Sequence, residues 1–497
     1  MAVFQHRHLF FAIITMMITK KDLNKISNYL WEIPKKFRSD MRVPARIYAD
    51  EKLLEDATQD ESIEQLINLC ALPGIQKYGL AMPDIHEGYA SPIGGVAAIS
   101  TADGIISPGM QGYDINCGMK LLRSDYSEKE LRLHLDELAT EIQKEVPSGL
   151  GRGHKIKLDI KSLDKILEGG AQELVKQGYA EKEDIENCEA GGRLEWADAS
   201  TVSSTAKNRG RDQVGTLGSG NHFLEIQKVA EIFDEEAAKV FGLFKDQVVI
   251  MIHCGSRGLG HQVATDYIRE FMGLMNKYKI RVPDREFACV PFNSPEGKRG
   301  LSASACAANY AWANRQMIAH YVRKAWQNIL GENTRPLTAV YDVTHNIIKL
   351  EKYDINGKEV EVAVHRKGAT RAFPPNHPEI PEKYQKVGQP VLIPGSMGTA
   401  SYILHGTEEA KESFYSTCHG AGRTMSRHQA TRTLSGQEII RDLEAKGIIV
   451  KCYSLRGIAE EAPQAYKDVN EVVEVVHQAG LSKKVAKLVP LAVIKGE

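Results

Sequence analysis

A short glycine-flanked segment, GYDINCG at residues 112–118, sets a carboxylate and a thiol close together. These groups belong to Asp114 and Cys117. In a turn that glycine leaves free to curl, a carboxylate and a thiolate can hold a divalent metal, and the thiolate can bridge two ions. The segment therefore predicts a metal-binding turn, provided that other parts of the chain supply further ligands.

Three histidines can supply these ligands, because each lies beside an apolar run or a glycine-rich loop. His222 follows GTLGSGN, His253 closes the apolar run VVIMI, and His345 closes YDVT. A lone histidine is more often a hydrogen-bonded core residue, but several in similar settings favour a metal site. Five oxygen, sulfur and nitrogen donors are too many for one structural zinc and suit two metals that share the thiolate. A thiolate prefers zinc to manganese, so the residue types leave the metal open.

A second group of residues suits phosphate chemistry. In STCHGAGR, glycines around His419 leave room for a large electrophile, and a histidine nitrogen can attack a nucleoside triphosphate at phosphorus. Arg423 in the same motif can neutralise the charge that develops on phosphate oxygens. These residue types also allow His419 to be a further metal ligand. MPDIHEGY places Asp84 in a predicted loop, and HRKGATR (365–371) and PGSMGTASY (394–402) are predicted loops suited to phosphate.

The composition is that of a globular protein and excludes several classes. With 497 residues, of which 42% are hydrophobic, the chain can bury a large core. Its formal net charge of −1 excludes a globally basic nucleic-acid-binding surface. Eight cysteines without a CxxC pair predict a reducing, cytoplasmic setting. The apolar run at 9–17 is too short to span a membrane, and we expect residues 1–20 to be disordered or to reflect a mis-annotated start.

The hydrophobic patterns predict a mixed α/β (α+β) fold, with central β-sheets flanked by helices. Ser127 and Glu130 form a capping box ahead of a helix that extends to residue 144, and 302–330 and 469–479 have helical patterns. β-Branched runs at 95–100, 248–252, 337–343, 360–364 and 390–393 predict strands that lead into polar loops. Because the motifs extend from residue 84 to residue 495, we expect a single large catalytic domain, 21–497, with its chemistry where strands end.

In their order along the chain, the motifs resemble those of the RtcB-type RNA ligases. They are MPDIHEGY, GYDINCG, GTLGSGNHF, HCGSRGLGHQV, VHRKGATRAF, PGSMGTASY, CHGAGR and a terminal IKG. The resemblance covers nearly the whole chain beyond about residue 50. It implies a GTP- and Mn²⁺-dependent ligase of tRNA splicing or RNA repair, which joins an RNA 3′-phosphate or 2′,3′-cyclic phosphate to a 5′-hydroxyl. The implied intermediates are a guanylyl-histidine and an RNA-(3′)pp(5′)G end.

The resemblance also implies a role for individual residues. Two Mn²⁺ ions would be held by Asp114, Cys117, His222, His253 and His345, with Cys117 as the bridge. His419 would take GMP from GTP, with Asp84 and Arg423 near the phosphates. The guanylate would be contacted by Asn221, Glu225, Ser396, Ser401, His419, Tyr466 and Lys495.

Contacts with RNA must come from local charge, since the chain is nearly neutral. The candidates are Lys207, Arg209 and Arg211, together with the run 152–161, although a charged run is more often a solvated face. No RRM-like aromatic motif is present, so base-specific reading is not expected. The implied partners are GTP and RNA, either tRNA exon halves or broken RNA. The resemblance leaves open an archease-type activator, and no membrane partner is expected.

Two other functions fit the same residues. A dinuclear phosphoesterase would use the same metal ligands, with His419 as a ligand or an acid. A non-catalytic RNA-binding protein would hold a structural metal. Labelling with GTP separates the three functions, since only the ligase forms a covalent protein–GMP adduct.

Overall fold

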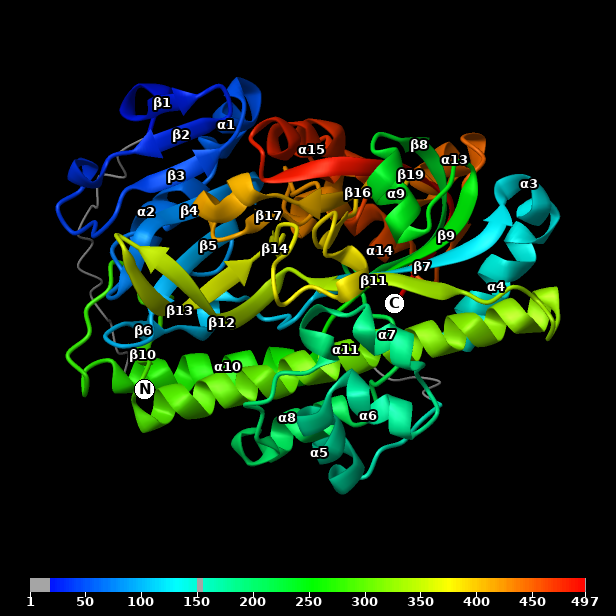
Figure 1. Ribbon diagram of the computed structural model, residues 1–497, viewed down its shortest axis with the longest axis horizontal. Helices are drawn as coiled ribbons and strands as arrows, with labels where there is room; N and C mark the ends of the chain where they lie inside the picture. Colours follow the sequence, from blue (N-terminus) through cyan, green and yellow to red (C-terminus); the bar gives the residue numbers. More distant parts are fainter. Residues whose placement is uncertain (1–17, 150–154, 497) are drawn as a thin grey trace, which may run out of the picture.

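Two large β-sheets form the framework of the computed structural model, which describes residues 18–149 and 155–496 (Figure 1). Helices and strands are mixed along the chain, which confirms the predicted α/β class. Most of the predicted N-terminal extension and the beginning of the basic run at 152–161 lie outside the described residues. No described helix is both long and apolar enough to cross a bilayer.

The first sheet has seven strands and contains the N-terminal part of the described chain. Neighbouring strands are antiparallel except for β3 and β4, which run parallel. Across the sheet the strands are β1 (Asn24–Ser27), β2 (Leu30–Ile33), β3 (Ala45–Tyr48), β4 (Ile75–His86), β5 (Ile93–Ser100), β13 (Lys358–Lys367) and β12 (Asn346–Ile355).

The second sheet has eight strands, and the ends of several of them bring distant parts of the chain together. Gly118 at the start of one strand pairs with Cys254 at the end of the next and with Thr344 at the end of a third. The strands are β11 (Thr338–Thr344), β7 (Gly118–Ser127), β9 (Gln247–Cys254), β8 (Phe223–Ile232), β19 (Ser482–Lys495), β16 (Ser401–Gly406) and β15 (Pro390–Ile393), with β18 (Ile449–Lys451) parallel to β19.

The longest helix, α11 (Pro295–Leu330), supports both sheets. Figure 1 shows it running along one side of the molecule with α10 (Arg257–Leu274) beside it, and it packs on β9 and β12. The helix begins seven residues earlier than the predicted 302, because Ser294 caps it by accepting the N–H of Gly297 and Pro295 occupies its first position. Its alanines are buried, and their small side chains allow the helix to pack closely on its neighbours.

The other helices lie mostly around the edges and faces of the sheets. Ser127 and Glu130 form the predicted capping box, but the predicted helix to residue 144 is interrupted. A 3₁₀ segment, Arg132–His134, separates α3 from α4, and its tighter turn shifts the phase of the second piece. The helices are α1 (Glu51–Ala57), α2 (Ser62–Leu69), α3 (Glu128–Leu131), α4 (Leu135–Glu145), α5 (Ile160–Gly169), α6 (Ala171–Lys176), α7 (Lys182–Glu186), α8 (Ser204–Gly210), α9 (Glu235–Phe241), α12 (Arg427–Thr433), α13 (Gly436–Ala445), α14 (Leu455–Glu460) and α15 (Val469–Gln478).

Two short strand pairs complete the framework. One joins β6 (Ile105–Ile106) to β10 (Val290–Pro291), and the other joins β14 (Ala369–Arg371) to β17 (Ser416–Cys418). The second pair matters for the site, because it carries the chain into the CHGAGR motif. The predicted strands all form, each within one or two residues of the predicted start or as part of a longer strand.

Candidate active site and metal centre

The five predicted metal ligands come together where neighbouring strands of the second sheet begin or end. Cys117 directly precedes β7, His222 directly precedes β8, and His253 lies near the end of β9. His345 lies between β11 and β12, where the chain passes from the second sheet to the first. The antiparallel register places these strand ends side by side, so the sheet itself positions the ligands.

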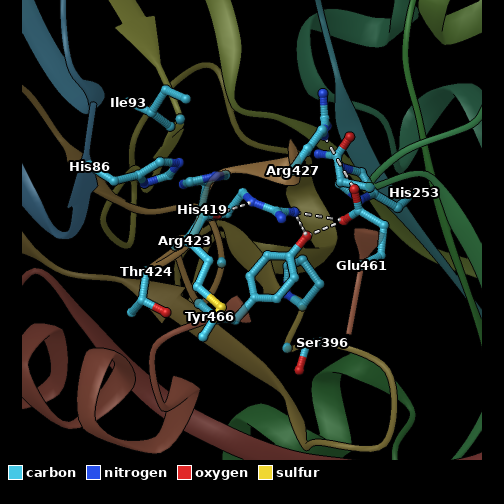
Figure 2. Close-up of a pocket in the computed structure, with 18 of the residues that line it drawn as sticks. His86, Ile93, His253, Ser396, His419, Arg423, Thr424, Arg427, Glu461 and Tyr466 are labelled. Carbon is cyan, nitrogen blue, oxygen red and sulfur yellow. Dashed lines mark hydrogen bonds and ion pairs between the residues drawn. The ribbon is translucent and has the colours of Figure 1, made fainter. Parts of the chain in front are cut away.

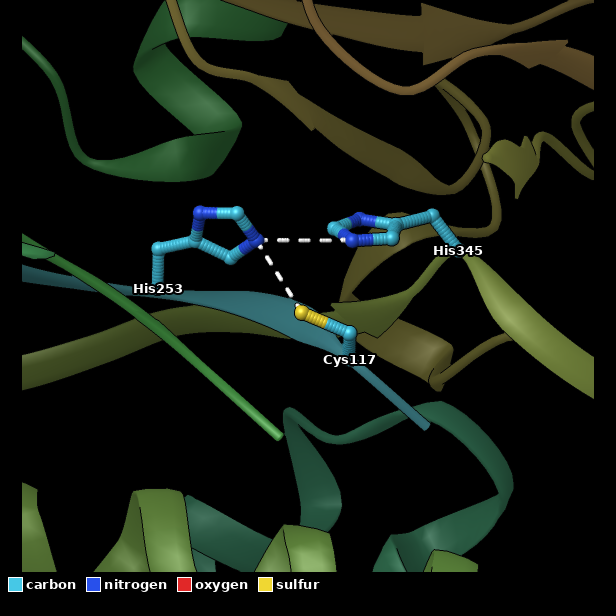
Figure 3. A group of neighbouring side chains, drawn as sticks. All are labelled: Cys117, His253 and His345. Carbon is cyan, nitrogen blue, oxygen red and sulfur yellow. Dashed lines mark hydrogen bonds between the residues drawn. The ribbon is translucent and has the colours of Figure 1, made fainter. Parts of the chain in front are cut away.

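The ligands form two groups that share one thiol. Cys117, His253 and His345 make one group, and Asp114, Cys117 and His222 make the other; within each, the ligand atoms lie within 4.8 Å of one another. Nε2 of His253 lies 3.2 Å from Sγ of Cys117 and 3.4 Å from Nε2 of His345, as Figure 3 shows. In the second group, Nε2 of His222 lies 3.5 Å from the same sulfur and 2.7 Å from Oδ2 of Asp114. This arrangement fits two cations bridged by Cys117.

The protonation of these side chains also fits a cation site. Burial lowers the pKa values of His253 and His345 well below the ordinary value, so both imidazoles are neutral and their nitrogens are free to ligate. Burial, followed by the charge of Asp114, raises the pKa of the Cys117 thiol to about 12. Burial opposes a charged His222, but nearby Cys254 and Asp114 outweigh it and raise the pKa of His222 well above its usual value. A proton thus occupies the space between His222 and Asp114 that a metal would take, and metal binding must release it.

A buried arginine on α11 fixes the loops that carry the ligands. Nη1 of Arg315 donates to the carbonyl oxygens of Asn116 at 2.7 Å and Cys254 at 2.9 Å. Its guanidinium also pairs with Asp342 at 2.8 Å, and both side chains are almost fully buried. The carbonyls belong to the neighbours of Cys117 and His253. Arg315 therefore holds two ligand-bearing segments at a fixed separation, and a helical pattern alone does not distinguish such a residue.

His419 lies directly after β17 and is paired with Asp84. Oδ2 of Asp84 accepts the backbone N–H groups of His419 at 2.8 Å and Gly420 at 3.2 Å, and it also accepts Nδ1–H of the His419 ring. Burial would raise the pKa of Asp84, but the interactions with His419 outweigh it and lower that pKa, so the carboxylate is ionised. In the neutral form of the ring, this hydrogen bond places the proton on Nδ1 and the lone pair on Nε2.

Asp84 lies on β4, not in the loop that the sequence predicts. The strand continues to His86, but its regular pairing with β5 is interrupted between Ala81 and His86, where Pro83 has no N–H to donate. This irregular stretch directs the buried Asp84 toward the CHGAGR motif. A Cβ at Gly422 of that motif would lie 2.5 Å from the carbonyl oxygen of Asp84, so this glycine allows the close approach.

A cavity of about 620 Å³ lies against His419 and two of the metal ligands, His253 and His345. Figure 2 shows His419 and His253 on its wall, with Arg423, Glu461 and Tyr466 between them. Ring centroids of His419 and His345 lie 5.1 Å apart, so the paired histidine borders the metal centre. The size suits a nucleotide, since small-molecule pockets commonly measure about 300–1,000 Å³.

The chain is similar in sequence to known proteins over most of its length. Residues 65–496 match the family profile described as tRNA-splicing ligase RtcB. The chain belongs to this family. It is 52% identical over 477 residues to the tRNA-splicing ligase RtcB of Thermococcus kodakarensis, which covers 95% of this chain and 99% of that protein. The corresponding protein of Aeropyrum pernix is 51% identical over 476 residues, with coverage of 95% and 99%. The RNA-splicing ligase RtcB of Mycobacterium bovis is 49% identical over 435 residues, with coverage of 87% and 100%.

Most residues that the RtcB resemblance assigns to the guanylate border the cavity. Lys495, at the end of β19, donates to the carbonyl oxygens of Gly220 at 2.6 Å and His222 at 2.8 Å and thereby holds the loop that carries Asn221. Two assigned residues lie behind the wall, where Gln227 donates to Glu225 at 2.6 Å and to Ser401 at 3.0 Å. The assigned residues that line the cavity are Asn221, Ser396, His419, Tyr466 and Lys495.

Arg423 is held by its own neighbours on the cavity wall. It donates to the carbonyl oxygen of Met425 at 3.0 Å and to the hydroxyl of Tyr466 at 2.9 Å, and it pairs with Glu461 at 3.2 Å. Contact with a phosphate would require it to exchange the Glu461 carboxylate for the ligand. Arg427, which the sequence analysis did not select, also lines the cavity and pairs with Glu461 at 3.3 Å. Because α12 begins at Arg427 and the segment from Arg423 is not helical, the spacing of the two arginines gives no sequence signal for this position.

The basic residues of HRKGATR are not in a loop, as the sequence predicts, but mainly on β13 and β14. Arg366 is fully buried and pairs with Glu351 at 2.6 Å, and Arg371 is likewise buried and pairs with Glu379 at 2.8 Å. These charges are neutralised inside the fold, where an unpaired charge would be costly. Only Lys367 of the three borders the cavity.

The residues predicted to contact RNA lie on and just after α8. Lys207 pairs with Asp164 at 2.7 Å, and Arg211 lies 3.7 Å from Asp212. Nη1 of Arg209 donates to Oε1 of Gln262 at 2.8 Å, a neutral partner. Arg209 therefore keeps the most effective positive charge of the three.

Proposed function

We propose that this protein is a GTP- and Mn²⁺-dependent RNA ligase that joins RNA 3′-phosphate or 2′,3′-cyclic phosphate ends to 5′-hydroxyl ends. The observation that carries the proposal is the pairing of His419 with the buried Asp84 at a cavity that also contains His253 and His345. The ligand groups alone would suit a phosphoesterase equally well. A further histidine, held by a carboxylate with one ring nitrogen free, supports covalent nucleotide transfer.

In the proposed reaction, Nε2 of His419 attacks the α-phosphorus of GTP. A nitrogen–phosphorus bond forms, the bond to the pyrophosphate oxygen breaks, and pyrophosphate leaves. Asp84 stabilises the positive charge that develops on the ring and keeps the proton on Nδ1. GMP then passes from His419 to the RNA 3′-phosphate, which gives an RNA-(3′)pp(5′)G end. The 5′-hydroxyl of the second RNA attacks that activated phosphate, and GMP leaves.

The metals would be held by Asp114, Cys117, His222, His253 and His345. When bound, two divalent cations supply charge neutralisation for the phosphates and activate the water that opens a cyclic phosphate. Their identity as Mn²⁺ rests on the family resemblance, because a thiolate with three imidazoles by itself favours zinc. The chain contributes the orientation of the ligands. For example, Ser256 donates its backbone N–H to Asp114 at 3.0 Å, and Arg315 fixes the loops beside Cys117 and His253.

The guanylate would be bound by residues of the cavity wall other than the metal ligands. Asn221 and Ser396 offer polar atoms there, and Tyr466 and Lys495 close the wall. Burial raises the pKa of Glu225 to about 7, with Lys495 opposing the rise. Because Glu225 lies behind the wall, the contact with guanine that the resemblance implies requires its ionised carboxylate to turn from Gln227 toward the N–H groups of the base, whereas Ser401 acts only through Gln227.

The RNA substrate is supported by the names of the relatives, which are tRNA-splicing and RNA-splicing ligases. We infer that the substrates are tRNA exon halves or broken RNA and that Lys207, Arg209 and Arg211 contact the RNA backbone. We also infer that an archease-type protein is an activating partner. The reaction would take place in the cytoplasm, where reducing conditions keep thiols free. All eight cysteines are unpaired, and seven are buried.

The deciding experiment is incubation of the protein with GTP labelled at the α-phosphate in the presence of Mn²⁺. We expect a protein–GMP adduct that is labile in acid and stable in alkali, as a phosphoramidate should be. His419→Ala abolishes it. The matched control is His428→Ala, because His428 is an exposed histidine of α12 outside the cavity wall and should leave the labelling unchanged.

The alternatives give different results in the same experiment. Absence of label, or label that survives His419→Ala, contradicts the proposed mechanism. A phosphoesterase would release phosphate from a 3′-phosphorylated RNA without any adduct. A non-catalytic RNA-binding protein would neither become labelled nor release phosphate.

A further inference from the structure

Three aromatic side chains from separate parts of the sequence lie in a row beside the metal centre. We call Tyr89, Tyr113 and His261 the aromatic ladder. Ring centroids of Tyr89 and Tyr113 lie 5.4 Å apart with an interplanar angle of 59°, and those of Tyr113 and His261 lie 5.0 Å apart at 27°. Both tyrosines are half-buried and His261 is exposed. The two tyrosines pack against the hydrophobic core on one side, and the ladder offers its remaining ring surface to solvent.

The ladder lies next to residues of the cavity wall. Tyr113 directly precedes the metal ligand Asp114, and a Cβ at the preceding Gly112 would lie 3.7 Å from side-chain atoms of Asn346 and Lys367, which both line the cavity. Nζ of Lys367 also donates to the carbonyl oxygen of Tyr89. A polynucleotide whose end lies at the metal centre can therefore leave the cavity along these rings.

The rings are carried by backbone that is held in place. Ala90, which follows Tyr89, has a φ of 62°, and its N–H donates to Oε2 of Glu286 at 2.7 Å. A left-handed conformation costs a non-glycine residue on the order of 1 kcal/mol, so the Glu286 contact helps to fix this turn. His261 lies near the start of α10. Rings on fixed backbone lose little conformational freedom when a ligand stacks on them.

The charges around the ladder suit a nucleotide. Arg209 donates to Gln262, the neighbour of His261, and so places a cation beside the outer ring. Partial burial of its ring, followed by the positive charge of Arg209, lowers the pKa of His261, and this ring is therefore neutral at neutral pH. The negative charges near the rings are Glu286, whose carboxylate accepts the N–H of Ala90, together with Asp284 and the metal ligand Asp114. A cation for the phosphate beside rings for the base is the combination by which single-stranded nucleic acids are bound.

We propose that the aromatic ladder is the stacking site for the terminal unpaired base of an RNA end, with Arg209 on its phosphate. The inference rests on the proposed ligase function and adds the place where that substrate is held. Because every base has a flat face, such a site selects an unpaired end rather than a sequence. The rings come from residues 89, 113 and 261, which explains why no local aromatic motif reveals the site.

The test uses RNA with the fluorescent base 2-aminopurine at the terminal nucleotide of either a 3′-phosphate end or a 5′-hydroxyl end. Each RNA is titrated with the His419→Ala protein, which cannot consume it. We expect stacking to quench the fluorescence at one of the two ends. His261→Ala, added to this background, should weaken binding of that RNA about tenfold, in line with the loss of one base–ring stack. His261→Phe keeps a ring and should restore binding.

An RNA that lacks its terminal base provides the matched substrate. Its binding should be about tenfold weaker in the His419→Ala background, and His261→Ala should add nothing to that loss. The inference is overturned if neither end is quenched, or if RNAs with and without the terminal base bind equally. Labelling of the wild-type protein by GTP needs no RNA. A failure there refutes the ligase proposal, whereas labelling without base-dependent binding refutes only the ladder.

Discussion

Replacement of Asp84 with asparagine tests the pairing that carries the proposed function. The amide oxygen of asparagine can accept the backbone N–H groups of His419 and Gly420, which Oδ2 of Asp84 accepts at 2.8 and 3.2 Å. The loop should therefore keep its position. The change removes the negative charge opposite Nδ1 of His419, and that charge is needed most when the ring becomes cationic during attack on phosphorus.

The magnitude follows from Coulomb's law. At an effective dielectric constant of about 20, opposite unit charges about 4 Å apart attract by about 4 kcal/mol. Loss of this stabilisation in the transition state slows the reaction about 10³-fold, since about 1.4 kcal/mol corresponds to a factor of ten. The variant should also be less stable by about 1–3 kcal/mol, because the new amide NH₂ takes the place of Oδ1. Oδ1 of Asp84 is buried and has no hydrogen-bond partner among the described residues.

The assay is the single-turnover rate at which labelled GMP becomes attached to the protein, with urea denaturation to show that the variant is folded. A rate within about fivefold of wild type would show that Asp84 does not support the nucleophile. The stability difference has its own pH dependence. Because His419 lowers the pKa of Asp84, the stabilisation is present above about pH 4 and is lost as the pH falls through the folded-state pKa.

Three further changes test the metal centre, its support and the guanylate site. Cys117→Ala removes the donor common to both ligand groups, so the metal content by elemental analysis should fall from two ions per chain to at most one; two retained ions would contradict the bridging role. Arg315→Met removes two carbonyl contacts and one of the two buried cations beside Asp342, with Lys120 remaining 3.7 Å away, so the free energy of unfolding in urea should fall by about 3 kcal/mol, and an unchanged value would disprove the bracing role. Burial raises the pKa of Glu225 to about 7, so GTP affinity by calorimetry should rise between about pH 6 and about pH 8 in wild type but not in Glu225→Gln, and a flat wild-type profile would argue against a contact through the carboxylate.

The sequence predicts the site best where a ligand directly follows or precedes an apolar strand. His253 and His345 are such residues, and the apolar runs before them form β9 and β11 as predicted. The alternation of apolar and polar residues also locates the strands, because burial of one or both sheet faces determines it. Which strands become neighbours depends on pairing over long separations, and local patterns carry no information about that pairing.

Residues that act through buried charge are harder to predict. Arg315 lies within an alanine-rich helical pattern, and only the fold reveals that it contacts two ligand-bearing loops. Asp84 was predicted in a loop because PDIHEG has the composition of a turn, whereas the structure continues the strand past Pro83. Arg366 was predicted to be available for phosphate, but Glu351 neutralises it on the adjacent strand. In each case the deciding partner is distant in sequence or lies on another element.

Strand β19 has a consequence for the time at which the protein becomes active during its synthesis. It pairs with β8, β16 and β18, and its last residue, Lys495, holds the carbonyl oxygens of Gly220 and His222. The ribosome makes this strand after every other described element. A nascent chain whose residues 482–495 are still inside the ribosome therefore lacks the strand that joins the middle of the second sheet and fixes the His222 loop. The molecule should become competent for guanylylation only once residues 482–495 have left the ribosome and closed the centre of this sheet.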